Sequence, residues 1–373
     1  MIAGEASGDL HGANLVKALK EKRQNIVFSG IGGKAMQDAG VEIVVDAATL
    51  SVVGITEVFS KLPGILSGMA AAKSFLKNAR PDLLILIDFP DFNLRIAAVA
   101  KKLNIPVLFY ISPQIWAWRS GRVTKIGSLV DHIAVILPFE ASFYRKHHIP
   151  VTFVGHPLLD EFRDHPFPSP VHPLQDTPPV IGLLPGSRES EIFRLLPVML
   201  QAARILSGQM DIRFVVSIAP GAPHDAIKAL CLPFQDELRL EIDPHGARSV
   251  FTKTHLVVAA SGTVTLEAAI AGTPMIIIYK VSPLSCLVGK ALIKVKHIGL
   301  VNLIAEREIV PELLQDRASP ELIAETVLKL VNTPSALDAI RHAFADVRIR
   351  LGGPGASSRV ADIALNMLKE DMK

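Results

Sequence analysis

Hydrophobic residues in this chain occur mostly in short continuous runs, each followed by Gly, Pro, Asp or Ser. Runs of this length without alternation are typical of strands buried on both faces of a parallel sheet. We expect such strands at residues 1–4, 26–29, 83–87, 106–111, 133–137 and 151–154, and again at 180–184, 213–218, 256–260 and 275–279. Helical segments separate the runs, so the pattern predicts an α/β fold of doubly wound, Rossmann-like sheets.

The chain changes character between residues 157 and 179, where seven prolines occur with little periodicity. Such a stretch is typical of an interdomain linker, and the α/β pattern starts again after it. We predict an N-terminal domain at 1–165, a proline-rich linker at 166–179, a C-terminal domain at 180–345 and a last helical segment at 346–373. A length of 373 residues is enough for two domains, each with its own core.

Composition narrows the class of protein. Hydrophobic residues make up 49% of the chain, yet no uninterrupted apolar run reaches the ~18 residues of a spanning helix. This surplus indicates large buried sheets and a surface that meets lipid. The N-terminus lacks a signal-peptide pattern, and Cys231 and Cys286 lack metal or redox spacing, so we expect a cytoplasmic protein. A net charge of +3 suits phosphate or anionic lipid and gives no support for nucleic-acid binding.

A first candidate site is the turn that follows the strand expected at 180–184. Gly186 frees the backbone, Ser187 can cap the next helix, and Arg188 adds a cation in its first turn. Free N–H groups, the positive end of a helix and a guanidinium suit a diphosphate. The alternative is an ordinary turn in which Arg188 is solvated or pairs with Glu191.

A second turn of this kind is Ser261-Gly262-Thr263, which follows the strand expected at 256–260. Its small residues allow a diphosphate to approach the backbone, and Glu267, one turn into the helix, can accept hydrogen bonds from ribose hydroxyls. A packing turn with an exposed glutamate is the alternative. Because both turns lie in one domain, we favour a nucleotide site.

Carboxylates follow the strand expected at 83–87, at the sheet edge where ligands bind in open α/β folds. A carboxylate there can act as general base toward a hydroxyl. Asp88 can instead bond the loop backbone, so we favour Asp91 as the base, with Asn93 orienting substrate or loop. Glu5, in the first loop, is a second candidate base, and His11 is a third. Either can also serve as a helix cap.

Other kinds of chemistry find no support in the sequence. GIGG at 30–33 is not the GxGxxG of a dinucleotide fold, and there is no nucleophile elbow or P-loop. The DxxD spacing at 88–91 differs from the DxD of metal-dependent sugar transferases, and no other cluster supplies a metal site. We therefore expect neither a metal nor a cofactor.

Two segments combine apolar and cationic residues in ways that suit lipid. Apolar residues at helical spacing between 52 and 76 predict a helix, for which a core-facing position is favoured over a lipid-facing one. The segment at 116–125 combines two tryptophans with arginines and a lysine, a composition typical of proteins that contact lipid headgroups at a membrane surface. For the lysines at 290–296, lipid contact and a solvated helix are equally supported. The side chains that we assign to lipid are Val58, Leu62, Met69, Trp116 and Trp118.

Taken together, these segments resemble the lipid-A-disaccharide synthase family, bacterial glycosyltransferases of GT-B architecture. The matching segments span nearly the whole chain in order: AGEASGD (3–9), GIGG (30–33), DFPDFN (88–93), SPQIWAWR (112–119), LPFE (137–140), GH (155–156), LLPGSRESE (183–191), SGTVTLE (261–267) and NL (302–303). Members usually have several more residues before the first of these segments, so we expect a shortened first strand or a late start.

The resemblance implies two facing Rossmann-like domains, with the C-terminal helix returning to the first. It implies that UDP-2,3-diacylglucosamine donates its sugar to 2,3-diacylglucosamine 1-phosphate, which forms a β-1,6-linked disaccharide and UDP. It also implies that the enzyme acts without a metal, as a peripheral protein that binds anionic phospholipid on the cytoplasmic face of the inner membrane. A homodimer is one arrangement that the resemblance allows. On this basis Ser7, Asp88 and Asn93 are assigned to the acceptor and Asn302, in a predicted loop, to the donor.

Two rival functions share parts of this pattern. A UDP-sugar 2-epimerase has the same two-domain plan but needs no acyl-binding surface. A non-catalytic sugar-nucleotide or lipid binding protein would tolerate the loss of Asp91. We favour the transferase, with inverting attack assisted by Asp91 and stabilisation of the leaving diphosphate by Arg188.

Overall fold

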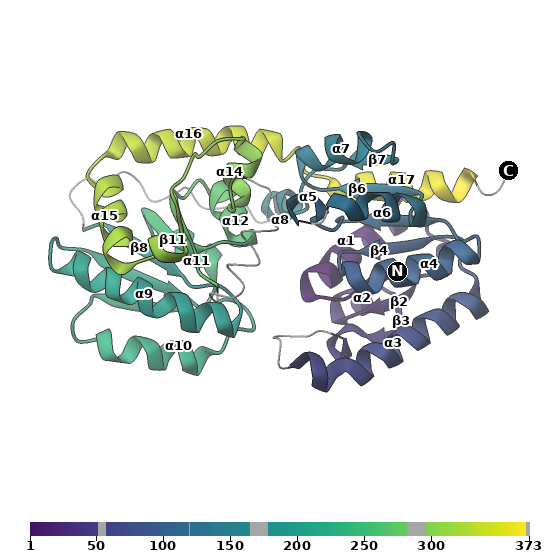
Figure 1. Ribbon diagram of the computed structural model, residues 1–373, viewed down its shortest axis with the longest axis horizontal. Coiled ribbons are helices and arrows are strands. Elements are labelled where there is room, and N and C mark those ends of the chain that lie inside the picture. Colours follow the sequence, from purple (N-terminus) through teal and green to yellow (C-terminus); the bar gives the residue numbers. More distant parts are fainter. Residues whose placement is uncertain (51–56, 119, 165–177, 282–295, 371–373) are drawn as a thin grey trace. The chain divides into compact units, whose positions relative to one another are not determined.

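The computed structural model describes the chain except for residues 51–56, 119, 165–177, 282–295 and 371–373 (Figure 1). The side chains at 6, 57–62, 117–118, 120, 163–164 and 369–370 also lie outside the description. The chain forms two compact units, one of Met1–Glu161 with Leu351–Lys373 and one of Phe162–Arg350. The predicted linker falls almost entirely outside the described residues, so the linker and the predicted domain bounds stay predictions.

The first unit contains a parallel seven-stranded sheet in the order β3-β2-β1-β4-β5-β6-β7. Its short first strand lies between β2 and β4, at the centre of the doubly wound plan. The strands are β1 Ile2–Ala3, β2 Ser29–Gly32, β3 Glu42–Asp46, β4 Leu84–Ile87, β5 Val107–Tyr110, β6 His132–Val135 and β7 Val151–Phe153.

Helices cover both faces of this sheet. They are α1 Ala6–Lys22, α2 Lys34–Asp38, α3 Glu57–Ala79, α4 Pro90–Lys102, α5 Ile115–Trp118, α6 Val123–Leu129, α7 Pro138–Arg145, α8 Leu158–Asp164 and α17 Ala356–Glu370. One core cluster joins α3, α4 and α6 to the sheet, and the other joins α1 and α2. The last helix, α17, packs beside α1 and buries Val360, Ala361 and Ala364 (Figure 1). The predicted return of the C-terminal helix to the first domain is confirmed.

The second unit contains a parallel six-stranded sheet in the order β10-β9-β8-β11-β12-β13. Its strands are β8 Val180–Leu184, β9 Arg213–Ser217, β10 Leu240–Asp243, β11 Leu256–Ala260, β12 Met275–Tyr279 and β13 Glu312–Leu314. Its helices are α9 Glu189–Ser207, α10 His224–Cys231, α11 Ala247–Phe251, α12 Thr263–Ala271, α14 Leu300–Ala305, α15 Pro320–Val331 and α16 Pro334–Arg350. The predicted pair of Rossmann-like domains is therefore confirmed.

Of the four strands at the edges of the two described sheets, the sequence pattern predicted β7, expected at 151–154, and missed β3, β10 and β13. Strands β3 and β10 carry polar residues and alternate in exposure, so they lack the continuous apolar run of a central strand. The strand expected at 26–29 was misplaced, because β2 runs through Gly30 and Gly32 instead of ending before them. Gly30 lies against the Met1 backbone, where a side chain would collide, and this contact explains a glycine inside the strand.

Among the described residues, no helix is both long and apolar enough to cross a membrane.

Candidate active site

In each unit the predicted catalytic and diphosphate-binding residues follow strands at the carboxyl edge of the sheet, where ligands bind in open α/β folds. The first unit supplies carboxylates and the second supplies glycine-containing turns at helix N-termini.

The loop after β4 has a tightly held and strained backbone. Asp88 and Phe89 both adopt left-handed conformations, with φ of 47° and 48°. For residues other than glycine such conformations cost about 1 kcal/mol or more each, and they cluster at functional sites. The buried Asn93 side chain fixes the loop, since its Nδ2 donates to the Asp88 carbonyl at 2.6 Å and to the Ile87 carbonyl at 3.3 Å.

Asp88 has the environment of a proton acceptor. Burial, and then the negative charge of Glu5, raise its pKa to about 6. Glu5 comes from the loop after β1, the strand paired with β4, so sheet pairing brings the two carboxylates together. A carboxylate with a pKa near 6 is ionised at pH 7 and is a stronger base than an ordinary aspartate.

Asp91 lies in a different environment. It is in the first turn of α4, its side chain is 76% exposed, and it accepts a hydrogen bond from Nη1 of Arg122 at 3.0 Å. Asp88, in contrast, is half-buried, and the negative charge of Glu5 acts on it. The geometry therefore favours Asp88 over Asp91, the base predicted from the sequence.

Two histidines of this unit, His11 and His156, are weak bases. Burial lowers the pKa of His11 to about 4 and that of His156 to about 3. Nδ1 of His156 accepts from the Leu158 backbone N–H at 3.2 Å, so this ring has a structural role. Ser7 is exposed in the first turn of α1, near the exposed Glu5.

Of the side chains assigned to lipid, Met69 requires correction. It is 7% exposed and belongs to the core beneath α3, so it does not face outward in this unit. Leu66, on the same helix, is 57% exposed. Trp116 is half-buried after β5. The side chains of Val58, Leu62 and Trp118 lie outside the described residues, and their assignments stay predictions.

In the second unit the turn after β8 is built around Gly186. Its φ of 106° favours glycine, and a side chain there would collide with Glu191. Helix α9 begins at Glu189 with Arg188 as N-cap and no side-chain capping bond, so the predicted cap by Ser187 was wrong. Arg188 is exposed and donates from Nη1 to Oε1 of Glu191 at 3.1 Å. This ion pair is the alternative role of Arg188 that the sequence left open.

The Ser261-Gly262-Thr263 turn lies beside this one, because β11 pairs with β8. Gly262 and Thr263 are exposed at the start of α12, whose first turn is closed by a bond from Oγ1 of Thr265 to the Gly262 carbonyl at 2.7 Å. Glu267 is half-buried on the same helix. Two helix N-termini thus adjoin at one sheet edge, an arrangement that suits the negative charge of a diphosphate.

Two further residues near these turns were not among the predicted site residues. Tyr279 is the last residue of β12, the strand next to β11. Burial raises the pKa of its hydroxyl; the charge of Glu191 raises it further, and the charges of Arg188 and Arg194 lower it. Arg194 donates to the Lys280 carbonyl at 3.3 Å. The sequence contained one indication of Arg194: Arg188, Glu191 and Arg194 are spaced three residues apart, which puts them on one side of the start of α9.

Asn302 also requires correction, because it lies in α14 rather than in a loop and is fully buried. Its Oδ1 accepts from Ile309 N at 2.8 Å and Val310 N at 3.1 Å. Its Nδ2 donates to the Val310 carbonyl at 2.9 Å and to Oε1 of Glu312 at 2.7 Å. These four bonds use the hydrogen-bonding capacity of the amide, so Asn302 holds the chain at 309–312 and has no group left for a donor sugar.

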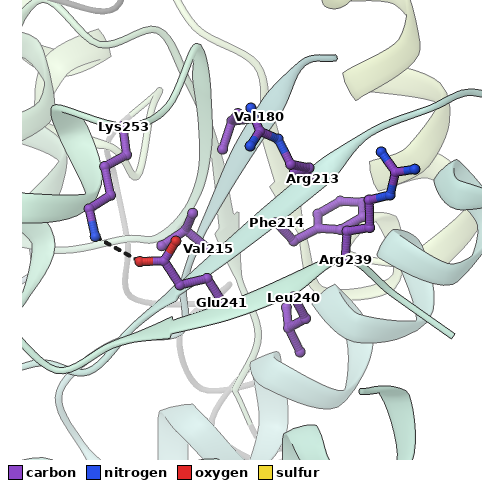
Figure 2. A pocket seen from close by; sticks show the side chains of 8 residues that line it. All are labelled: Val180, Arg213, Phe214, Val215, Arg239, Leu240, Glu241 and Lys253. Atoms are coloured by element: carbon purple, nitrogen blue, oxygen red, sulfur yellow. Dashed lines mark hydrogen bonds and ion pairs between the residues drawn. The ribbon is translucent and has the colours of Figure 1, made fainter. Parts of the chain in front are cut away.

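A cavity of about 460 Å³ lies at the opposite, amino-terminal edge of the second sheet, where β8, β9 and β10 begin (Figure 2). Its charged groups are largely paired: Lys253 donates to Glu241 and Asp243 at 2.7 Å each, and Arg239 pairs with Asp211 at 2.7 Å. The cavity is separate from the two helix N-termini and is not part of the candidate site.

Solved structures of the same fold define the class of protein. A putative UDP-N-acetylglucosamine 2-epimerase from Listeria monocytogenes is similar with a TM-score of 0.65 at 13% identity, covering 96% of this chain and 93% of that one. The calicheamicin glycosyltransferase CalG4 is similar with a TM-score of 0.58 at 15% identity, covering 98% and 96%. The chain thus has the GT-B fold that sugar-nucleotide glycosyltransferases and epimerases share.

Sequence relatives identify the particular family. The profile described as Lipid-A-disaccharide synthetase matches residues 1–366. The lipid-A-disaccharide synthase of Syntrophus aciditrophicus (strain SB) is 47% identical over 383 residues, covering 99% of this chain and 97% of that protein. That of Trichlorobacter lovleyi is 44% identical over 378 residues, covering 99% and 97%. The chain belongs to the lipid-A-disaccharide synthase family, whose members are hexosyltransferases, and the epimerase alternative is not favoured.

Proposed function

We propose that this enzyme transfers the sugar of UDP-2,3-diacylglucosamine to 2,3-diacylglucosamine 1-phosphate, releasing UDP and forming the β-1,6-linked disaccharide 1-phosphate. Family membership supports the reaction class. The observation that carries the catalytic proposal is the place of Asp88 in a strained loop at the carboxyl edge of the first sheet, where burial and the charge of Glu5 raise its pKa to about 6.

In this mechanism Asp88 takes the proton of the acceptor 6-hydroxyl. The hydroxyl oxygen bonds to the anomeric carbon on the face opposite UDP, while the bond from that carbon to the diphosphate oxygen breaks. The electron pair of the broken bond leaves with UDP, and the configuration at the sugar inverts. Glu5 keeps Asp88 basic through its charge, and Asn93 holds the loop that carries Asp88.

The second unit stabilises the leaving group. We assign the diphosphate to Gly186, Ser187, Arg188 and the Ser261-Gly262-Thr263 turn, and the ribose to Glu267. Arg188 is exposed and pairs with Glu191, and its guanidinium can exchange this carboxylate for a phosphate of the bound nucleotide. Fixed donors at two adjoining helix N-termini stabilise developing charge without reorganisation.

The same proposal includes peripheral binding to anionic phospholipid, because both substrates carry acyl chains. The exposed Leu66 on α3 supports it. Cosedimentation with anionic vesicles tests this part: substitution of Leu66 by Asp is expected to reduce the bound fraction, and unchanged binding would remove α3 from the lipid-facing surface.

One assay tests the reaction. The enzyme is incubated with UDP-2,3-diacylglucosamine, with and without 2,3-diacylglucosamine 1-phosphate, and the products are separated. Formation of UDP and disaccharide only when the acceptor is present supports the transferase. A free sugar-nucleotide isomer formed without acceptor would indicate an epimerase, and binding without any product would indicate a non-catalytic protein.

A further inference from the structure

Glu140 is a buried carboxylate that the proposed chemistry does not use. It is the third residue of α7, which follows β6, and it is 2% exposed. Its Oε1 accepts hydrogen bonds from the Trp116 indole N–H at 3.0 Å and from the Ser112 hydroxyl at 3.3 Å. Its Oε2 accepts from the Leu137 backbone N–H at 3.0 Å. One side chain therefore joins the start of α7 to the loop after β5.

A carboxylate at this position is energetically costly. Burial raises the pKa of Glu140 to about 7, because its hydrogen-bond donors are neutral groups that only partly replace lost hydration. Helix capping alone would not require burial, since an exposed glutamate at the third helical position can reach the same backbone N–H. The bonds that burial adds are those to Trp116 and Ser112.

The loop that Glu140 holds adjoins the catalytic loop. Strands β4 and β5 are paired, with Ile87 beside Tyr110, and the Asp88 N–H donates to the Tyr110 carbonyl at 3.2 Å. The segment at 112–116, which runs from the loop after β5 into α5, is also contacted by α7, where the Trp116 ring packs edge-on against Phe139 with centroids 4.7 Å apart. Trp116 is thus fixed at two points, through its N–H and through its ring.

We propose that Glu140 is a positioning residue for the acceptor: by fixing the indole of Trp116, it holds the ring as an apolar wall beside the Asp88 loop, against which the acylated acceptor sugar packs. This inference rests on the proposed function, which assigns the acceptor to the first unit. A glutamine cannot replace Glu140 in this role. It can accept on one side only, and its NH₂ group would face either the Trp116 N–H or the Leu137 N–H.

The first test measures the position of Trp116 directly. The chain has two tryptophans, so in a Trp118→Phe background Trp116 is the only one. Glu140→Gln is expected to shift the emission maximum of Trp116 and increase its quenching by acrylamide. Glu312→Gln is the matched control, because Glu312 is also a buried carboxylate that holds a loop, in the second unit, by accepting from Ile298 N at 2.9 Å and Gly299 N at 3.1 Å. The control should leave Trp116 emission unchanged. Unchanged emission in Glu140→Gln would overturn the proposal.

The second test measures kinetics in the otherwise unsubstituted enzyme above pH 7, where a carboxylate with a pKa of about 7 is mostly ionised. Glu140→Gln is expected to raise the KM for the acceptor about tenfold, the effect of losing a charged hydrogen bond, with the donor KM within about twofold. Trp116→Phe keeps an aromatic ring, smaller than the indole, but loses the N–H, and it should raise the acceptor KM similarly. The double variant should be no worse than either single variant. Additive losses, or an equal rise in donor KM, would overturn the proposal.

The two proposals can fail separately. Trp116→Phe serves if Glu140→Gln does not fold. Binding of 2,3-diacylglucosamine 1-phosphate is measured by equilibrium titration, without turnover. If the unsubstituted enzyme forms no disaccharide but the variants bind 2,3-diacylglucosamine 1-phosphate more weakly than it does, the positioning role is supported and only the proposed reaction is refuted. Unaltered binding in an enzyme that does form disaccharide would refute the positioning role alone.

Discussion

The carboxylates of Glu5 and Asp88 follow two paired strands, β1 and β4, and the charge of Glu5 adds to burial in raising the pKa of Asp88 to about 6. Residues 83 positions apart are coupled in this way because parallel strands end at one edge of the sheet. The coupling gives the candidate base a strength that neither loop would give it alone.

The pH dependence of kcat/KM should report this coupling. Below about pH 6 Asp88 is protonated and cannot accept the hydroxyl proton, so the rate is expected to rise with pH through that value and then level off. Glu5→Gln removes the neighbouring charge and should move the midpoint to lower pH, while the remaining burial keeps it above the ordinary value of 3.8. A midpoint that does not move would show that Glu5 has no electrostatic effect on the base.

The two aspartates of the loop should differ sharply when substituted. Asp88→Asn is expected to lower kcat by about 100-fold or more, the usual contribution of a general base. Asp91→Asn, which loses only an exposed pair with Arg122, is the matched control and should stay within about tenfold. Circular dichroism checks that both variants fold. If Asp91→Asn lost more activity than Asp88→Asn, the base predicted from the sequence would be reinstated.

Arg188 offers a test of the donor half. Arg188→Ala is expected to lower kcat by about 100-fold, because a fixed donor to the leaving diphosphate is lost. Arg204→Ala is the control: Arg204 lies on the same helix and pairs with Glu237 at 2.6 Å, far along α9 from the turn. Its activity should match that of the unsubstituted enzyme. Equal losses in the two variants would mean that the effect comes from the helix and not from the diphosphate.

Asn302 is expected to act on stability. Asn302→Ala removes the acceptor of two buried backbone N–H groups and should lower the free energy of unfolding by about 3 kcal/mol. Denaturant unfolding measures this change. Normal stability with a raised donor KM would contradict the structural role and restore Asn302 as a donor contact.

The sequence predicted most of the inner strands because each is a buried apolar run, and it missed the edge strands β3, β10 and β13, which carry polar residues in place of such a run. It also located the turn at Gly186, whose backbone conformation only glycine adopts readily. It did not separate Asp88 from Asp91, since the difference lies in burial and in Glu5, which tertiary structure brings close. The burial of Glu140 was likewise hidden, because a glutamate early in a helix resembles an ordinary capping residue.

Glu140 should finally leave a signature in the pH dependence of stability. Its pKa is about 7 in the folded protein and 4.5 is its ordinary value, so between these values the folded state binds a proton that the unfolded state does not. The free energy of unfolding should therefore fall as pH rises from about 4.5 to 7, by on the order of 3 kcal/mol at most from this group. The measurement is the difference between the unsubstituted protein and Glu140→Gln at each pH, which cancels the similar contribution of Asp88. The free energy of unfolding of the unsubstituted protein, relative to that of Glu140→Gln, should fall steadily toward pH 7. A difference that is constant with pH would show that folding leaves the pKa of Glu140 at its ordinary value.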